Sequence, residues 1–183
     1  MIVDSPFVLW FTGLSASGKT TLSNAVKHFF ESNNMFHFEI LDGDEIRTNL
    51  SKGLSFSKED RDTNIRRVGW VAHKLHKHGV NVLVSVISPY ENIRNEVREM
   101  IGKGFIEIYM NCPIEECEKR DPKELYKKAR AGILKGFTGV DDPYEAPSNP
   151  EISINSSEMN VSKEVEKIIN FLEVNKYISM NHR

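Results

Sequence analysis

The chain has 183 residues, of which 39% are hydrophobic and 27% are charged, and its formal net charge is −2. This length and composition are typical of one globular domain with a buried core, so we expect a single domain over residues 1–183. The near-neutral charge excludes a strong overall attraction to nucleic acid or to an anionic membrane, so we expect neither as a partner. No stretch resembles a signal peptide or a membrane span, which predicts a cytoplasmic protein.

Apolar patterning predicts strands and helices in alternation along the chain. A strand at residues 7–12 precedes a helix that starts at Gly18, and a strand at 36–41 precedes a helix at 55–75 that Ser57 caps, with Asp60 three residues on. The later elements are a strand at 80–87, a helix around 93–101, strands at 105–110 and 151–154, and a closing helix around 165–172. The order predicts an α/β, doubly wound fold with a mostly parallel five-stranded sheet.

The loop after the first strand carries the clearest motif. It reads GLSASGKTT and fits the pattern GxxxxGK[ST], in which backbone N–H groups close around phosphate oxygens. Lys19 is expected to reach the β- and γ-phosphates of ATP, and the Thr20 hydroxyl is expected to join the shell of a Mg²⁺ ion. The predicted ATP-binding residues are Gly13, Leu14, Ser15, Ala16, Ser17, Gly18, Lys19, Thr20 and Thr21.

Two carboxylates, Asp42 and Asp44, follow the second strand on either side of Gly43, and Arg47 comes one helical turn later. Strand ends of this kind meet at one edge of a parallel sheet, so this turn should face the phosphate loop. There, a carboxylate could orient the waters of a metal ion or accept a hydroxyl proton. The alternative is a simple turn with an N-capping aspartate.

Residues 118–137 are rich in lysine and arginine and lack the apolar pattern of a core segment. Such a run is usually a solvated helix face and is sometimes a nucleic-acid patch. Behind a phosphate loop, the same composition fits a mobile basic lid that closes over the transferring phosphoryl group. Arg120 and Arg130 are the candidates for contacts with ATP.

A histidine cluster and a cysteine pair are not expected to form a metal site or a redox site. His73, His76 and His78 alternate with lysines at an expected helix end, which favours a solvated last turn over a metal centre. Cys112 and Cys117 have neither the spacing of a CxxC redox pair nor that of a zinc site, so we expect both to be reduced.

Six segments in order along residues 7–154 strongly resemble the adenylylsulfate kinases, also called APS kinases. They are GLSASGKTT, LDGDEIR, FSKEDRDTNIRR, ISPY, RDPKELYKKARAG and KGFTGVDDPYEAPSNPEI. The resemblance implies a fold of the P-loop nucleotide kinase type, with ATP and Mg²⁺, and transfer of the γ-phosphoryl group to the 3′-hydroxyl of adenosine 5′-phosphosulfate. It also implies a homodimer and a functional link to ATP sulfurylase.

The resemblance assigns roles position by position. Asp42 matches the carboxylate tied to magnesium and to the reacting hydroxyl. Phe56 and Phe137 match two aromatic residues that stack on the acceptor's adenine, although a loop anchor is an equally good interpretation of each from the sequence alone. Glu45 replaces the asparagine usual in the family's DNIR segment, which puts any side-chain amide contact there in doubt. The remaining matches to acceptor contacts are Asp44, Ile46, Arg47, Arg61, Asn64, Ile87, Ser88, Lys123, Lys135 and Gly136.

Ser88 has two interpretations. The family treats this serine in some members as a phosphorylated intermediate, which makes it a catalytic candidate beside Lys19 and Asp42. No neighbouring base activates it in the sequence, and direct transfer between two bound nucleotides needs no covalent step, so we favour a role in holding the acceptor. Two rival functions stay open: a P-loop kinase of another small acceptor, and a non-catalytic nucleotide-binding partner of an ATP sulfurylase.

Overall fold

The computed structural model describes residues 1–180. Its centre is a five-stranded sheet in which every pairing is parallel and the strand order is β3-β4-β2-β5-β6. The strands are β2 (Val8–Thr12), β3 (Phe38–Asp42), β4 (Asn81–Ser85), β5 (Phe105–Met110) and β6 (Ile152–Ile154). The predicted doubly wound α/β fold is confirmed.

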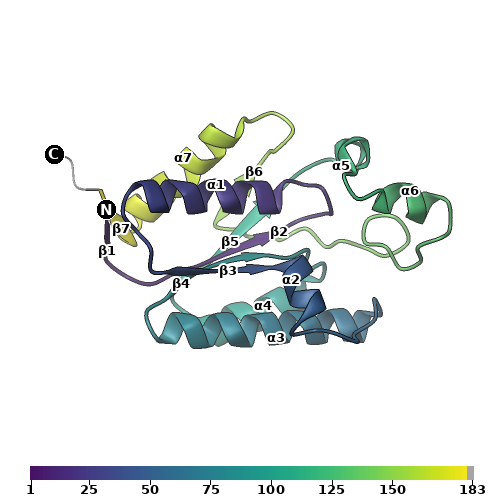
Figure 1. Cartoon of the computed structure of the whole chain (residues 1–183), viewed down its shortest axis with the longest axis horizontal. Coiled ribbons are helices and arrows are strands. Elements are labelled where there is room, and N and C mark those ends of the chain that lie inside the picture. The colour runs from purple at the N-terminus through teal and green to yellow at the C-terminus, as the bar shows by residue number, and fades with distance from the viewer. Residues whose placement is uncertain (181–183) are drawn as a thin grey trace.

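Helices cover both faces of this sheet (Figure 1). One face carries α1 (Lys19–Ser32) and α7 (Val161–Val174), and the other carries α3 (Lys58–Lys77) and α4 (Glu91–Ile101). Alternate residues of β2 point to opposite faces: Leu9 and Phe11 join the core under α1 and α7, while Val8 and Trp10 join the core under α3 and α4. The nearly continuous apolar strands therefore follow from burial on both faces.

The predicted helix starts and strand ends hold to within a few residues. The Ser57 hydroxyl accepts a hydrogen bond from Asp60 N at 3.2 Å and caps α3, as the sequence indicates. The strand predicted at 80–87 ends earlier, at Ser85, because the chain turns out of the sheet before Ser88, whose φ is +42°.

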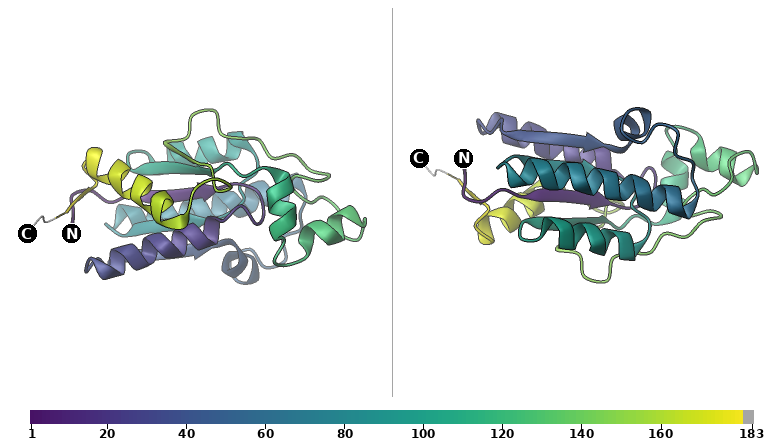
Figure 2. Two further views of the ribbon diagram at one scale, coloured as in Figure 1. Left: turned by 90° about the horizontal axis from the view of Figure 1, so that it is seen from above. Right: turned by 90° about the horizontal axis from the view of Figure 1, so that it is seen from below.

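Several short elements were not predicted. The DGDEIR segment forms a brief helix, α2 (Gly43–Thr48), rather than only a turn. Two-residue strands β1 (Ile2–Val3) and β7 (Ile178–Ser179) pair antiparallel near the chain ends. The predicted lid contains the end of α5 (Ile114–Arg120) and all of α6 (Leu125–Arg130), and both helices project beyond the sheet at the end opposite the termini (Figure 2). In the described part of the chain, no helix is long and apolar enough to cross a lipid bilayer.

Candidate active site

The phosphate loop lies between the carboxyl end of β2 and the start of α1, in a conformation that needs glycine. Gly13 has a φ of +149°, and a Cβ atom there would lie 2.9 Å from both Met110 O and Ser17 Oγ. Any side chain at this position would clash with the backbone of β5. The first glycine of the motif therefore permits the tight curve of the phosphate loop.

Lys19 folds back onto its own loop. Its ammonium donates to Gly13 O at 3.0 Å, to Leu14 O at 2.6 Å and to Ser17 Oγ at 3.4 Å. Burial lowers the pKa of Lys19 to about 8, and the nearby charge of Asp42 opposes that shift only in part. A buried ammonium held only by neutral oxygens is a strong attractor for a phosphate anion.

Asp42 uses its two carboxylate oxygens for different partners. Oδ1 accepts from Asp44 N at 2.9 Å and caps α2, while Oδ2 accepts from Thr20 Oγ1 at 3.0 Å. One side chain therefore caps α2 and also contacts Thr20 of the phosphate loop. The Thr20 hydroxyl and the Asp42 carboxylate supply hard oxygen ligands side by side, which fits a Mg²⁺ ion that also binds phosphate and water.

A wholly protein-bound metal centre finds no support. Among residues 1–180, no three His, Cys, Asp or Glu side chains gather as a metal-binding group. The histidine-lysine run ends α3, as the sequence predicts, and His76 Nε2 lies 3.1 Å from Pro6 O.

The lid cations divide into those that reach the site and those that do not. Arg120 donates to Ser156 O at 2.7 Å and to Ala16 O at 3.5 Å, so it lies against the phosphate loop. Lys123 forms an ion pair with Asp44 of α2, across the mouth of the site. Arg130 instead pairs with Glu118 of α5, and Lys135 is exposed. The structure thus brings Arg120 and Lys123 to the site and leaves Arg130 bracing the two lid helices.

The residues matched to the acceptor gather between α3 and the segment that follows the lid. The Phe56 side chain is 56% exposed, and the Arg47 guanidinium lies 5.0 Å from its ring centroid. Phe137 is buried and meets Tyr126 edge to face, with ring centroids 5.0 Å apart. In this conformation the exposed Phe56 ring has the Arg47 and Arg61 guanidinium groups as neighbours, whereas Phe137 has an aromatic neighbour.

Arg61 is buried and most of its donors are in use. Nε donates to Phe56 O at 2.8 Å, the two Nη atoms donate to Thr138 Oγ1 and Gly136 O, and Nη1 lies 3.3 Å from Asp142. The guanidinium therefore ties the start of α3 to the end of the lid and to the residue that follows it. Asn64, one turn later, is buried with no partner for its Oδ1.

The Ser88 hydroxyl lies inside the protein. It accepts from Trp10 Nε1 at 3.1 Å and donates to Thr12 Oγ1 at 2.9 Å, and the residue is 1% exposed. Thr12 Oγ1 also donates to Ile87 O at 2.7 Å. These bonds fix the segment after β4 to β2 and leave the serine oxygen little access to a phosphoryl group.

Cys112 and Cys117 are both free and buried. Cys117 Sγ donates a long hydrogen bond of 3.9 Å to Cys112 O, and burial raises the pKa of the Cys117 thiol to about 12. The prediction of reduced cysteines is confirmed. Together with Tyr126, Ala129 and Phe137, they form a small apolar core inside a segment that the sequence left without one.

Two contributors to the site were missed from the sequence. Tyr126 Oη donates to Ser15 O at 3.0 Å, and Ser156 Oγ donates to Ser17 O at 2.8 Å, so both hold the phosphate loop from outside. Their only sequence signals were a tyrosine within the basic run and a serine after a short strand. Neither signal identifies a partner more than a hundred residues away.

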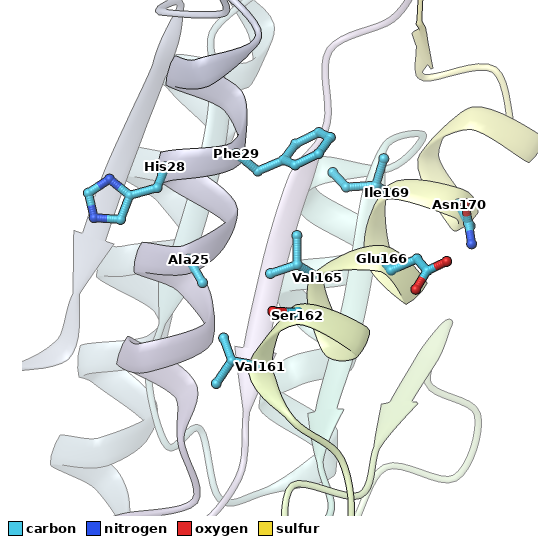
Figure 3. Close-up of a pocket in the computed structure, with 9 residues that line it drawn as sticks. All are labelled: Ala25, His28, Phe29, Val161, Ser162, Val165, Glu166, Ile169 and Asn170. Atoms are coloured by element: carbon cyan, nitrogen blue, oxygen red, sulfur yellow. The ribbon is translucent and has the colours of Figure 1, made fainter.

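A separate hollow of about 480 Å³ lies between α1 and α7 (Figure 3). Its walls are largely apolar, with Phe29, Val165 and Ile169 among the side chains that line it. None of its residues belongs to the predicted site. It is distinct from the phosphate loop in both position and chemistry.

Comparison with known proteins agrees with this arrangement. A family model described as Adenylylsulphate kinase matches residues 5–155. An adenylyl-sulfate kinase of Picosynechococcus sp. is 55% identical over 171 residues, which cover 93% of this chain and 96% of that relative. Among solved structures, the Mycobacterium tuberculosis APS kinase CysC in complex with AMPPNP and APS has a TM-score of 0.86 and 38% identity, covering 92% of this chain and 98% of that one. The hexameric APS kinase from Thiobacillus denitrificans has a TM-score of 0.72 and 31% identity, covering 96% of this chain and 30% of that one.

Proposed function

Since this chain belongs to the adenylylsulfate kinase family and is an ATP-dependent phosphotransferase, we propose how its residues divide the work of the reaction. The reaction moves the γ-phosphoryl group of ATP to the 3′-hydroxyl of adenosine 5′-phosphosulfate and leaves ADP. Both substrates are nucleotides, so the site needs two separate nucleotide subsites with their phosphates turned toward each other. The phosphate loop and the Phe56 region supply these two subsites.

The donor half is the phosphate loop with Lys19. When the triphosphate is bound, the Lys19 ammonium exchanges its own-loop carbonyls for the β- and γ-phosphates, where negative charge develops during transfer. Thr20 and Asp42 would hold Mg²⁺, which neutralises phosphate charge. Arg120 adds a second cation beside the loop. Arg130 acts indirectly, because its ion pair with Glu118 holds the two lid helices together.

The acceptor half is built from two aromatic rings and two arginines. Phe56 and Phe137 hold the adenine, and Arg47, whose guanidinium is only half-buried, faces the phosphosulfate with part of its fork free. Arg61 shapes the pocket by holding Phe56 O and Gly136 O in place. Asp42 orients the 3′-hydroxyl and takes its proton.

Ser88 is proposed to hold the acceptor side in place through its backbone, without a covalent step. The buried Ser88 hydroxyl already forms hydrogen bonds with Trp10 and Thr12, which argues against its phosphorylation. Ser88→Ala should therefore retain turnover at a reduced rate. Complete loss of turnover, together with a stable phosphoserine in the wild-type protein, would favour the covalent route.

The hydrogen bond between Thr20 and Asp42 is the observation that carries this division of roles, because it joins the metal-binding hydroxyl to the carboxylate at the reacting position. The direct test is an ATP consumption assay with adenosine 5′-phosphosulfate, in which the product is identified by its 3′-phosphate. A panel of sugar and nucleoside monophosphate acceptors serves as the control. Faster phosphorylation of any of those acceptors would overturn the assignment of the acceptor half.

Association with other proteins is proposed on separate grounds. Trp70 is 56% exposed and lies in an apolar hollow with Leu50, Val71 and Met100, the kind of surface that marks a protein contact. We propose that a second copy covers this face in a homodimer, which light scattering on the wild-type protein and on Trp70→Glu would test. The acceptor joins sulfate to an adenylate, so an ATP sulfurylase that makes this bond is proposed as the functional partner in the cytoplasm.

A further inference from the structure

The carbonyl groups of the phosphate loop are held from outside, one after another. Tyr126 Oη donates to Ser15 O at 3.0 Å, Arg120 lies at Ala16 O, and Ser156 Oγ donates to Ser17 O at 2.8 Å. In a trans peptide, the carbonyl of one residue and the N–H of the next point in opposite directions. Fixing these carbonyls outward therefore turns the N–H groups of the following residues toward the bound phosphates.

Tyr126 differs from the other two anchors because its ring has a second partner. The residue is 2% exposed, and its ring meets Phe137 edge to face at a centroid distance of 5.0 Å and an interplanar angle of 89°. Phe137 is a proposed acceptor contact, whereas Ser15 belongs to the donor loop. One side chain thus touches both subsites, with its ring on one side and its hydroxyl on the other.

We propose that Tyr126 is a positioning residue that couples acceptor binding at Phe137 to the geometry of the phosphate loop at Ser15. This rests on the proposed placement of the acceptor's adenine against Phe137. An adenine that shifts or orders Phe137 changes the packing of the Tyr126 ring, and the hydroxyl carries that change to Ser15 O. Binding of either nucleotide then favours the loop conformation that the other needs, as reciprocal linkage requires.

The chemistry of the tyrosine supports this role. Burial raises the pKa of Tyr126 far above its ordinary value, so the hydroxyl stays protonated and remains a donor to Ser15 O across the working pH range. A phenylalanine at the same position would keep the ring against Phe137 and lose only the hydroxyl. The structure therefore offers a one-atom test of the coupling.

The experiment measures the affinity for ADP by calorimetry with and without saturating adenosine 5′-phosphosulfate, a pair that cannot react. In the wild-type protein the acceptor should tighten ADP binding by about 5-fold or more, the lower end of typical allosteric coupling. In Tyr126→Phe this ratio should fall close to one, while the affinity for the acceptor alone changes less than about 2-fold because the ring contact is kept. Thermal unfolding of the variant confirms that the lid core is intact.

Ser156→Ala is the matched control, because it frees the same loop at Ser17 O without any contact to Phe137. It should weaken ADP binding and leave the coupling ratio as in the wild type. The proposal is overturned if the wild-type ratio is already one, if Tyr126→Phe keeps the wild-type ratio, or if Ser156→Ala loses the ratio equally. If Phe137 does not contact the acceptor, Phe137→Ala would bind the acceptor normally. That result distinguishes failure of the proposed acceptor site from failure of the coupling.

Discussion

Asp42 is the residue for which the structure allows the sharpest separation of fold from catalysis. One oxygen caps α2 at Asp44 N, and the other accepts from Thr20. An asparagine at this position keeps the capping oxygen, and asparagine caps helices about as well as aspartate does. It loses the negative charge that a metal ion and a hydroxyl proton require.

The two possible substitutions therefore have different expected outcomes. Asp42→Asn should leave the unfolding free energy within about 0.5 kcal/mol of the wild type, whereas Asp42→Ala should lower it by about 1 kcal/mol through loss of the cap. Both should lower kcat by roughly 100-fold or more, which is about 2.7 kcal/mol of transition-state stabilisation. Denaturant unfolding and steady-state rates measure the two quantities on the same preparations.

A matched control is available at the N-cap of α7. Asn160 caps α7 through a hydrogen bond of 3.0 Å from Lys163 N, and it belongs to neither nucleotide subsite. Asn160→Ala should therefore lose about 1 kcal/mol of stability and keep the wild-type kcat. The catalytic interpretation of Asp42 would be refuted by an Asp42→Asn protein that turns over at the wild-type rate, because only the capping role would then remain.

Three further predictions concern the other parts of the site. Lys19→Met should abolish turnover with the fold intact. The pKa of Lys19 is about 8 in the folded protein, below its usual value of about 10.4. Between these two pH values the unfolded chain therefore binds more protons at Lys19 than the folded protein does. The unfolding free energy of the wild type, relative to that of Lys19→Met, should rise with pH in that window. A flat difference in urea unfolding across those pH values would contradict the burial of this ammonium. Residues 118–137 should be cut by protease in the free protein and protected when ADP and the acceptor are both present, and an unchanged cleavage pattern would exclude lid closure. Phe137→Ala should weaken acceptor binding by about 1–3 kcal/mol, with normal acceptor binding in calorimetry as the contrary result.

Local signals in the sequence predicted the local features of the fold. The phosphate loop, the Ser57 cap and the apolar strand β4 depend on residues that are neighbours in the chain, so spacing alone was enough. The brief helix α2 was missed because the DGD turn signal and its capping aspartate also fit a simple turn. Strands β1 and β7 are two residues each, too short for any periodicity to appear.

The sequence predicted which residues belong to the candidate site better than it predicted what those residues contact. Arg61 matched an acceptor contact of the family, yet the structure shows its guanidinium joined to Gly136 O and Thr138, more than seventy residues away. Arg130 was expected near ATP, yet it pairs with Glu118. Such partners depend on how distant segments pack, and periodicity carries no information about which distant side chain an arginine will meet.

A buried network around Arg94 lies on one side of the proposed acceptor subsite, and the predicted lid lies on the other. On one side Arg94, which is 1% exposed, donates to Glu107 at 2.8 Å, to Ser88 O at 2.7 Å and to Glu145 O at 2.7 Å. Removing a partner from such a buried network costs several kcal/mol, so this side is rigid. On the other side the lid joins the site through the exposed ion pair of Lys123 with Asp44, which contributes about 1 kcal/mol or less, and through the buried cluster that contains Tyr126 and Phe137. We therefore expect any closure over the acceptor to come from the lid, while the floor around Arg94 stays in position.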